Sequence, residues 1–434
     1  MKRYSREFLF KSTLMASAIA SMTAPLIAQA DPLENLPYAV SGGTPNLDMR
    51  LRYENVDQEL PATLTEKASA LTIRSRLGYT TGKWNGIDAQ LEFENVTAIG
   101  DDDFQSTENG SKPDIAKYPV VADPEGSELN QAWIRYAGPA KTTVKVGRQR
   151  IKFDNDRHIG NVGWRQREQT YDGYLVTNTF LPKTTFDYAY LTNVNSFRFF
   201  TVPGRTANVN RDIEAQLIHL AYAHSKALSV SAYGYLLDWE ANTAPAAPAD
   251  SQTIGLRATG TVPLSGDFSL SYQAEYAQQT DYQDSTDVVD ADYWLAELGG
   301  MYKKANLKVG YEVLGSNDGL YAFQTPLATL HAFQGWADMF LVTPGNGIQE
   351  FYVSVGGTVE KVALMARWSD YSADEGSGDY GSEINLQATR PITDQLSFGV
   401  KYADYSGETS APIVGPSPIK GDVTKYWAWL EYKF

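Results

Sequence analysis

Apolar and polar side chains alternate strictly along many segments of the chain. Between residues 47 and 54, Leu, Met, Leu and Tyr alternate with Asp, Arg, Arg and Glu, and segments 71–80 and 87–94 repeat this pattern. A period of two puts all apolar side chains on one face of a β-strand and the charges on the other. The runs approach about ten residues, the length with which a tilted strand crosses a bilayer. The pattern therefore predicts a transmembrane β-barrel rather than a sandwich of shorter strands.

Further strands are predicted by the same alternation along the rest of the chain. With the first three they make about eighteen, an even number within the range of outer-membrane barrels. They lie near residues 129–137, 141–150, 171–181, 184–193, 213–224, 227–239, 251–262, 267–278, 291–303, 305–314, 348–357, 360–370, 382–391, 395–405 and 423–434.

The connections between these strands alternate in length, which predicts short periplasmic turns and long extracellular loops. The fold class is thus all-β, an antiparallel transmembrane barrel. The short connections are 82–86, 138–141, 181–184, 225–226, 263–267, 303–306, 357–361 and 391–395. The long ones are 57–67, 100–127, 151–170, 194–212, 240–250, 279–290, 315–347, 371–381 and 406–422.

Both ends of the chain carry export signals. Residues 1–30 combine positive residues, a short apolar run and the sequence Ala-Gln-Ala, which predicts a cleaved signal peptide. Residues 31–434 would then form a single barrel domain. The last strand alternates to a terminal Phe434, resembling the signal for insertion of outer-membrane proteins. We therefore expect the protein in the outer membrane of a Gram-negative bacterium.

Charge and composition exclude several classes of function. The formal charge is −15, and it becomes −18 without the signal peptide, which argues against a nucleic-acid partner. The absence of cysteine removes disulfides and thiolate chemistry, and we expect no metal site and no cofactor. The four histidines lack metalloprotease spacing, and no nucleophile elbow or phosphate loop is present, so no enzyme is predicted.

One stretch, residues 146–173, is basic in this acidic chain, with six positive against four negative side chains. It passes from one predicted strand through a glycine-containing loop into the next. Arginines on the polar faces of neighbouring strands should converge with it on one wall of the lumen. Their planar guanidinium groups suit carboxylates, and rings of such residues select anions in pores. The predicted pore-lining residues are Arg50, Arg52, Arg74, Arg76, Arg135, Lys145, Arg148, Arg150, Arg157, Arg165 and Arg167.

Each part of this site has an alternative interpretation. The arginines could instead neutralise acidic residues across the lumen, namely Asp48, Glu54, Glu92 and Glu94. Loop 151–170 could fold inward as a constriction or project into the surface polysaccharide. The stretch 331–340, HAFQGWADMF, resembles a short helix that either lines the mouth or packs on the rim. Acidic segments 101–103 and 281–292 could hold Ca²⁺ bridged to surface lipid, or simply be solvated.

Two long segments carry a family resemblance. Residues 146–173, VGRQRIKFDNDRHIGNVGWRQREQTYDG, and residues 323–358 are similar to the alginate export family of outer-membrane barrels. The resemblance implies an eighteen-stranded monomeric barrel with an arginine-rich pore for an anionic polysaccharide. One departure is the connection 391–395, which is short here, whereas the export member has a long periplasmic turn after strand sixteen.

The sequence therefore supports a main function and alternatives. The main interpretation is a channel that passes anionic sugars, oligosaccharides or polysaccharides such as alginate and other uronates. A general diffusion porin for small hydrophilic solutes is the second, and a barrel enzyme or adhesin is the third. Outer-membrane lipids, lipopolysaccharide and an anionic carbohydrate solute are the expected partners of a monomer.

Overall fold

The computed structural model describes residues 35–100, 103–106, 114–196, 210–240, 249–285, 287–408 and 419–434. The predicted signal peptide and most of the acidic segment 101–103 lie outside these residues, so both remain predictions. Among the described residues, no helix is long and apolar enough to cross a membrane.

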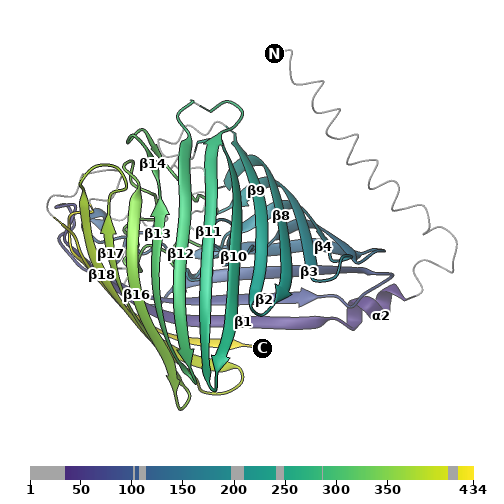
Figure 1. Ribbon diagram of the computed structural model, residues 1–434. Coiled ribbons are helices and arrows are strands. Elements are labelled where there is room, and N and C mark those ends of the chain that lie inside the picture. The colour runs from purple at the N-terminus through teal and green to yellow at the C-terminus, as the bar shows by residue number, and fades with distance from the viewer. Residues whose placement is uncertain are drawn as a thin grey trace, which may run out of the picture.

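Eighteen strands form one antiparallel sheet that closes on itself, because β1 pairs with β20 as well as with β2. Figure 1 shows the strands as a continuous curved wall. This confirms the predicted barrel. The strands are β1 (Thr44–Gln58), β2 (Ala68–Thr80), β3 (Ile87–Ala98), β4 (Gly126–Ala137), β5 (Thr142–Gln149), β6 (Thr170–Asn178), β7 (Thr184–Asn195), β8 (Asn210–Ser225), β9 (Leu228–Trp239), β10 (Ser251–Ser265), β11 (Phe268–Asp281), β12 (Asp290–Tyr302), β13 (Ala305–Leu314), β16 (Ile348–Val359), β17 (Val362–Ser372), β18 (Asp379–Pro391), β19 (Leu396–Ser406) and β20 (Val423–Lys433).

Short elements complete the described chain. Helix α2 (Leu36–Ser41) precedes β1 at one end of the barrel (Figure 1), and a 3₁₀ turn, η1 (Ile115–Lys117), lies between β3 and β4. Strands β14 (Ser316–Asn317) and β15 (Tyr321–Ala322) form a small hairpin. The helix suggested for residues 331–340 is wrong: this segment is a series of turns. Gln334 and Asp338 have positive φ there, which interrupts a right-handed helix.

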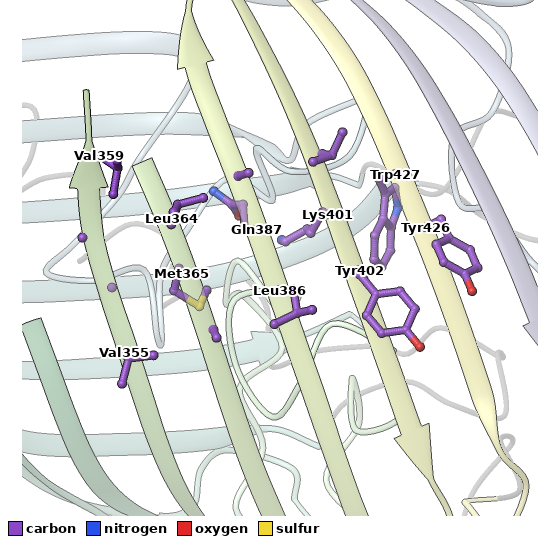
Figure 2. Close-up of a pocket in the computed structure, with 15 residues that line it drawn as sticks. Val355, Val359, Leu364, Met365, Leu386, Gln387, Lys401, Tyr402, Tyr426 and Trp427 are labelled. Carbon is purple, nitrogen blue, oxygen red and sulfur yellow. The ribbon is translucent and has the colours of Figure 1, made fainter. Parts of the chain in front are cut away.

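The two faces of the wall have opposite chemistry, as the alternation requires. Leu91 and Phe93 on β3 are 54% and 59% exposed, whereas Glu92 and Glu94 between them are buried inside the barrel. An apolar groove of about 960 Å³ lies along β16–β20 (Figure 2), and Val355 and Leu386 are among the exposed side chains that line it. The outer surface thus suits lipid, and the charges point inward.

The interior of the barrel is occupied by two connections. We call residues 150–169, between β5 and β6, the first inward loop, and residues 323–347, between β15 and β16, the second inward loop. Apolar side chains of both, such as Phe153, Ile159, Phe323 and Leu327, belong to one buried cluster with inward residues of the strands. A barrel of this strand number is wide enough for an aqueous lumen, so these loops decide what can pass.

A charge placed on the outer face should test this arrangement. We expect Leu256→Arg, in β10, to lower the free energy of unfolding by about 2–4 kcal/mol, because Leu256 is exposed on the lipid face. The matched variant Leu264→Arg, beside the turn that ends β10, should cost only about 0–1 kcal/mol. Urea titration of the refolded protein in vesicles measures both. Equal costs would contradict the proposed position of the membrane.

Candidate functional site

The first inward loop reaches opposite walls of the barrel. Arg165 Nη1 lies 3.0 Å from Glu54 Oε2 on β1, and Arg157 Nε lies 2.7 Å from Glu312 Oε1 on β13. All four side chains are less than one-tenth exposed. Of the two interpretations of this loop, the geometry therefore corresponds to the inward one.

The two inward loops also bind each other through their main chains. Gly160 N donates to Leu327 O at 2.8 Å, and Thr329 N donates to Asp156 O at 2.9 Å. A Cβ atom at Gly160 would lie 2.9 Å from Thr329 N, so this close approach needs a glycine. Because these bonds join the loops directly, a displacement of one loop disturbs the other.

The second inward loop is attached to strands on its own side. Gln334 Nε2 donates to Glu312 Oε2 at 2.7 Å, so Glu312 holds both loops. The main-chain N–H groups of Trp336 and Ala337 donate to Glu383 Oε1 on β18, at 2.5 and 2.9 Å. Two carboxylates of the wall thus fix the turns of residues 331–340.

Most of the basic residues predicted to line the pore are buried and paired. Their partners include all four acidic residues that the sequence suggested as neutralising groups. The pairs are Arg52 with Asp123, Arg74 with Asp48, Arg76 with Glu94, Arg150 with Glu92 and Glu168, Arg157 with Glu312, Arg165 with Glu54 and Asp338, and Arg167 with Glu128. Since removal of one partner from a buried pair leaves an uncompensated charge, these arginines act first as anchors.

Arg50 anchors the first inward loop without a carboxylate. It is 5% exposed and donates to the main-chain oxygens of Gly163, Trp164 and Arg165, and to the Gln166 side chain at 2.9 Å. A guanidinium group can serve several acceptors at once because its five N–H donors form a fixed fork. Arg50 therefore shapes the loop at the point where it meets β1.

Arg148 departs from the sequence prediction. Its neighbour Gln149 is fully buried, and Gln149 pairs across the strands with Tyr171, whose hydroxyl donates to Gly160 O of the first inward loop. Because adjacent residues of a strand point to opposite faces, Arg148 lies on the outer face, where Asp172 binds it at 2.8 Å. The prediction that Arg148 lines the pore is thus corrected.

Arg135 and Lys145 lie together on the inner wall of the barrel, away from the two inward loops' anchoring pairs. They lie opposite each other on β4 and β5, and each charged group is 5.4 Å from the Trp133 ring centroid. The Arg135 side chain is 40% exposed and Nε donates to Asp88 at 2.9 Å. Lys145 forms no salt bridge within the described part of the chain. This pair, near the turn at 138–141, is the best candidate for direct contact with a solute.

Arg150 and Glu168 close the base of the first inward loop. Arg150 Nε donates to Glu168 Oε1 at 2.5 Å, and Arg150 Nη2 donates to Glu92 at 2.7 Å. Burial alone would raise the pKa of Glu168, but the charges of Arg76 and Arg150 outweigh it and lower the pKa to about 2. The carboxylate therefore stays ionised, and this anchor holds, until the pH falls through that value.

Several residues at the loops were not predicted as functional. Asp154 accepts a hydrogen bond from Ser231 at 2.9 Å and lies 3.0 Å from His219 Nε2. The serine bonds to the carboxylate rather than to the histidine. The described residues contain no group of ligands suited to a metal ion.

A second unpredicted group comprises His331, Asp338, Lys401 and Lys425, which lie between the second inward loop and β19–β20. The aromatic character of residues 331–340 was the one signal in the sequence that pointed to it.

Comparisons with known proteins agree with this architecture. A family model described as alginate export matches residues 46–314. No curated protein shows significant sequence similarity to the chain. Among solved structures, OpdL of Pseudomonas aeruginosa is similar with a TM-score of 0.64 and 17% identity, covering 91% of this chain and 99% of OpdL. OccAB2 of Acinetobacter baumannii gives 0.68 and 15%, covering 91% and 98%.

The outer membrane protein OprD from Pseudomonas aeruginosa is also similar, with a TM-score of 0.63, 15% identity, and 90% and 93% coverage of the two chains. The predicted location in the outer membrane of a Gram-negative bacterium is confirmed by this fold together with the family match.

Loss of one anchor should loosen both inward loops. We expect Arg157→Met to cost about 3–5 kcal/mol of unfolding free energy, because it leaves Glu312 buried without its cation. The matched variant Lys152→Met, whose side chain is 51% exposed, should cost less than about 1 kcal/mol. Thermal unfolding followed by gel mobility compares them. Similar stability of the two variants would show that Arg157 is not an anchor.

Proposed function

The chain belongs to the alginate export family, and we propose that within it this protein is a diffusion channel for small hydrophilic solutes. The observation that carries the proposal is the pair of inward loops, which are bound to each other and to opposite walls. The structural relatives are porin-like channels, which supports a channel rather than an enzyme or adhesin.

The inward loops argue against passage of a long polysaccharide. A polymer needs a continuous wide path, and clearing one here would require separating Arg157 from Glu312 and Arg165 from Glu54. Breaking buried pairs costs about 3–5 kcal/mol each when one charge is left unpaired. Small solutes need a much narrower path than a polymer, and Arg135 and Lys145 lie on the inner wall of the barrel.

A preference for anionic sugars is the second candidate, and Lys145 is the observation that favours it. Its ammonium group has no carboxylate partner in the described chain, and it lies beside Arg135 and Trp133. Two cations and an aromatic ring on one wall suit a sugar with a carboxylate. We further propose that the barrel is monomeric and contacts outer-membrane lipid and lipopolysaccharide.

Permeation by solutes of increasing size tests the main proposal. We expect vesicles containing the protein to swell with monosaccharides and disaccharides, and uronate oligomers to leave the ionic current in planar bilayers unchanged. Blockage of an anion-selective current by these oligomers would instead support the alginate-like function.

A charge reversal tests the candidate contact residue separately. Lys145→Glu should move the reversal potential under a KCl gradient toward cation selectivity, because it replaces an accessible cation by an anion. Lys183→Glu, at the β6–β7 turn outside the barrel wall, is the matched control. An unchanged reversal potential would remove Lys145 from the solute path.

A further inference from the structure

One buried lysine joins both inward loops to the barrel wall. Lys401 is on the inward face of β19, directly opposite Trp427 of β20, and Figure 2 labels the two residues on these neighbouring strands. Its ammonium Nζ lies 3.6 Å from the ring centroid of Trp336 in the second inward loop and 4.0 Å from that of Trp164 in the first. Aromatic faces attract a cation, so Lys401 binds the two loops at once.

The same ammonium group is hydrogen-bonded to a histidine. Lys401 Nζ lies 2.9 Å from Nε2 of His331, and Nδ1 of His331 lies 2.7 Å from Asp338 Oδ1. An ammonium group can only donate, so Nε2 must accept and the imidazole proton must be on Nδ1, where it donates to Asp338. The imidazole ring is also stacked on Trp164, with 4.9 Å between ring centroids. With Lys401 charged, this geometry requires a neutral His331.

We propose that Lys401 and His331 form a proton-sensitive latch that holds the inward loops in place and opens when His331 takes up a proton. A proton on Nε2 would face the ammonium of Lys401 across 2.9 Å, so the hydrogen bond would be lost and replaced by repulsion. The inference deepens the proposed channel function and rests on it, since the latch controls the space beside the loops.

The charged groups around His331 determine whether its protonation stabilises or destabilises the closed arrangement of the loops. Asp338, on the same loop, is bound by Arg165 of the first inward loop at 2.7 Å and by Lys425 of β20 at 3.0 Å. Glu383 of β18 holds the neighbouring main chain, and Arg165 in turn reaches Glu54 of β1. Two other cations, Arg165 and Lys425, therefore already neutralise Asp338. Asp338 cannot also compensate the positive charge that His331 would gain on protonation.

The direction of the pKa shift agrees with this geometry. Burial and the Lys401 charge lower the pKa of His331 well below its usual value, against the opposing effect of Asp338. In the open state the exposed imidazole regains a pKa of about 6.5. The open state then binds more protons, so the ratio of closed to open latch falls by up to about tenfold for each pH unit below about 6.5.

Conductance of the full mature chain in planar bilayers tests the latch. We expect the wild-type conductance to rise severalfold between about pH 7.5 and about pH 4.5, a range that brackets the usual imidazole pKa. His331→Gln keeps an acceptor for Lys401 and a donor for Asp338 but takes up no proton, so its conductance should stay low throughout. His224→Gln, an exposed histidine on β8, is the matched control and should follow the wild type.

The contrary outcomes are distinct. A wild-type conductance independent of pH, or an acid response retained in His331→Gln, would overturn the latch. Loss of the response in Glu383→Gln but not in His331→Gln would also overturn it, because the proton would then act at Glu383. Absence of any current from the wild type would instead fail the proposed channel function.

The rate of thiol labelling, measured at a single pH, tests the role of Lys401 independently of the ionic current. The chain contains no cysteine, so Ala337→Cys, at a buried position of the second inward loop, introduces a single thiol. We expect Lys401→Met in this background to increase the rate of thiol labelling at about pH 7.5 by at least about tenfold, because the loops lose their cation. Equal labelling rates with and without Lys401 would overturn its role as the latch.

Discussion

The cost of an unpaired charge inside a closed barrel governs the whole interior of this protein. The wall turns its polar face inward, and the inward loops exclude much of the water that would otherwise solvate that face. Arg52, Arg74 and Arg167 are each only 1% exposed, which is tolerable only because carboxylates or main-chain oxygens surround them. The position of the loops and the pairing of the wall are therefore one arrangement, and neither exists without the other.

Because of this dependence, many arginines in the lumen do not by themselves indicate a pore that selects anions. In an open pore, an inward arginine meets water and solute, and its charge selects what passes. Here the loops carry both signs, with Arg157, Arg165 and Arg167 against Glu168, and they satisfy wall residues of both signs. In the proposed channel, a solute would meet the charges of Arg135 and Lys145 rather than the sum of all basic residues.

The alternation of residues was sufficient to predict the strands and their number, because a period of two is a local property of the chain. The roles of the arginines, in contrast, depend on partners that are far away in the sequence. Arg157 is 155 positions from its partner Glu312, and no pattern along the chain connects them. The overall basic character of residues 146–173 does not reveal that Arg148 lies on the outer face, which follows only from the alternation of single residues along β5. Residues 331–340 looked helical by their spacing, but contacts with Glu383 and Glu312 stabilise turns instead.

The interlocking of the two loops also constrains how the molecule can be assembled. The first inward loop follows β5, yet it is held by residues of β11, β13 and the second inward loop, which are synthesised much later. The seam between β1 and β20 is the last contact that the chain order allows to form. The contacts that hold the first inward loop therefore join parts of the chain that are far apart in sequence, and such contacts form slowly. The loop can reach its final position only after β11, β13 and the second inward loop are in place.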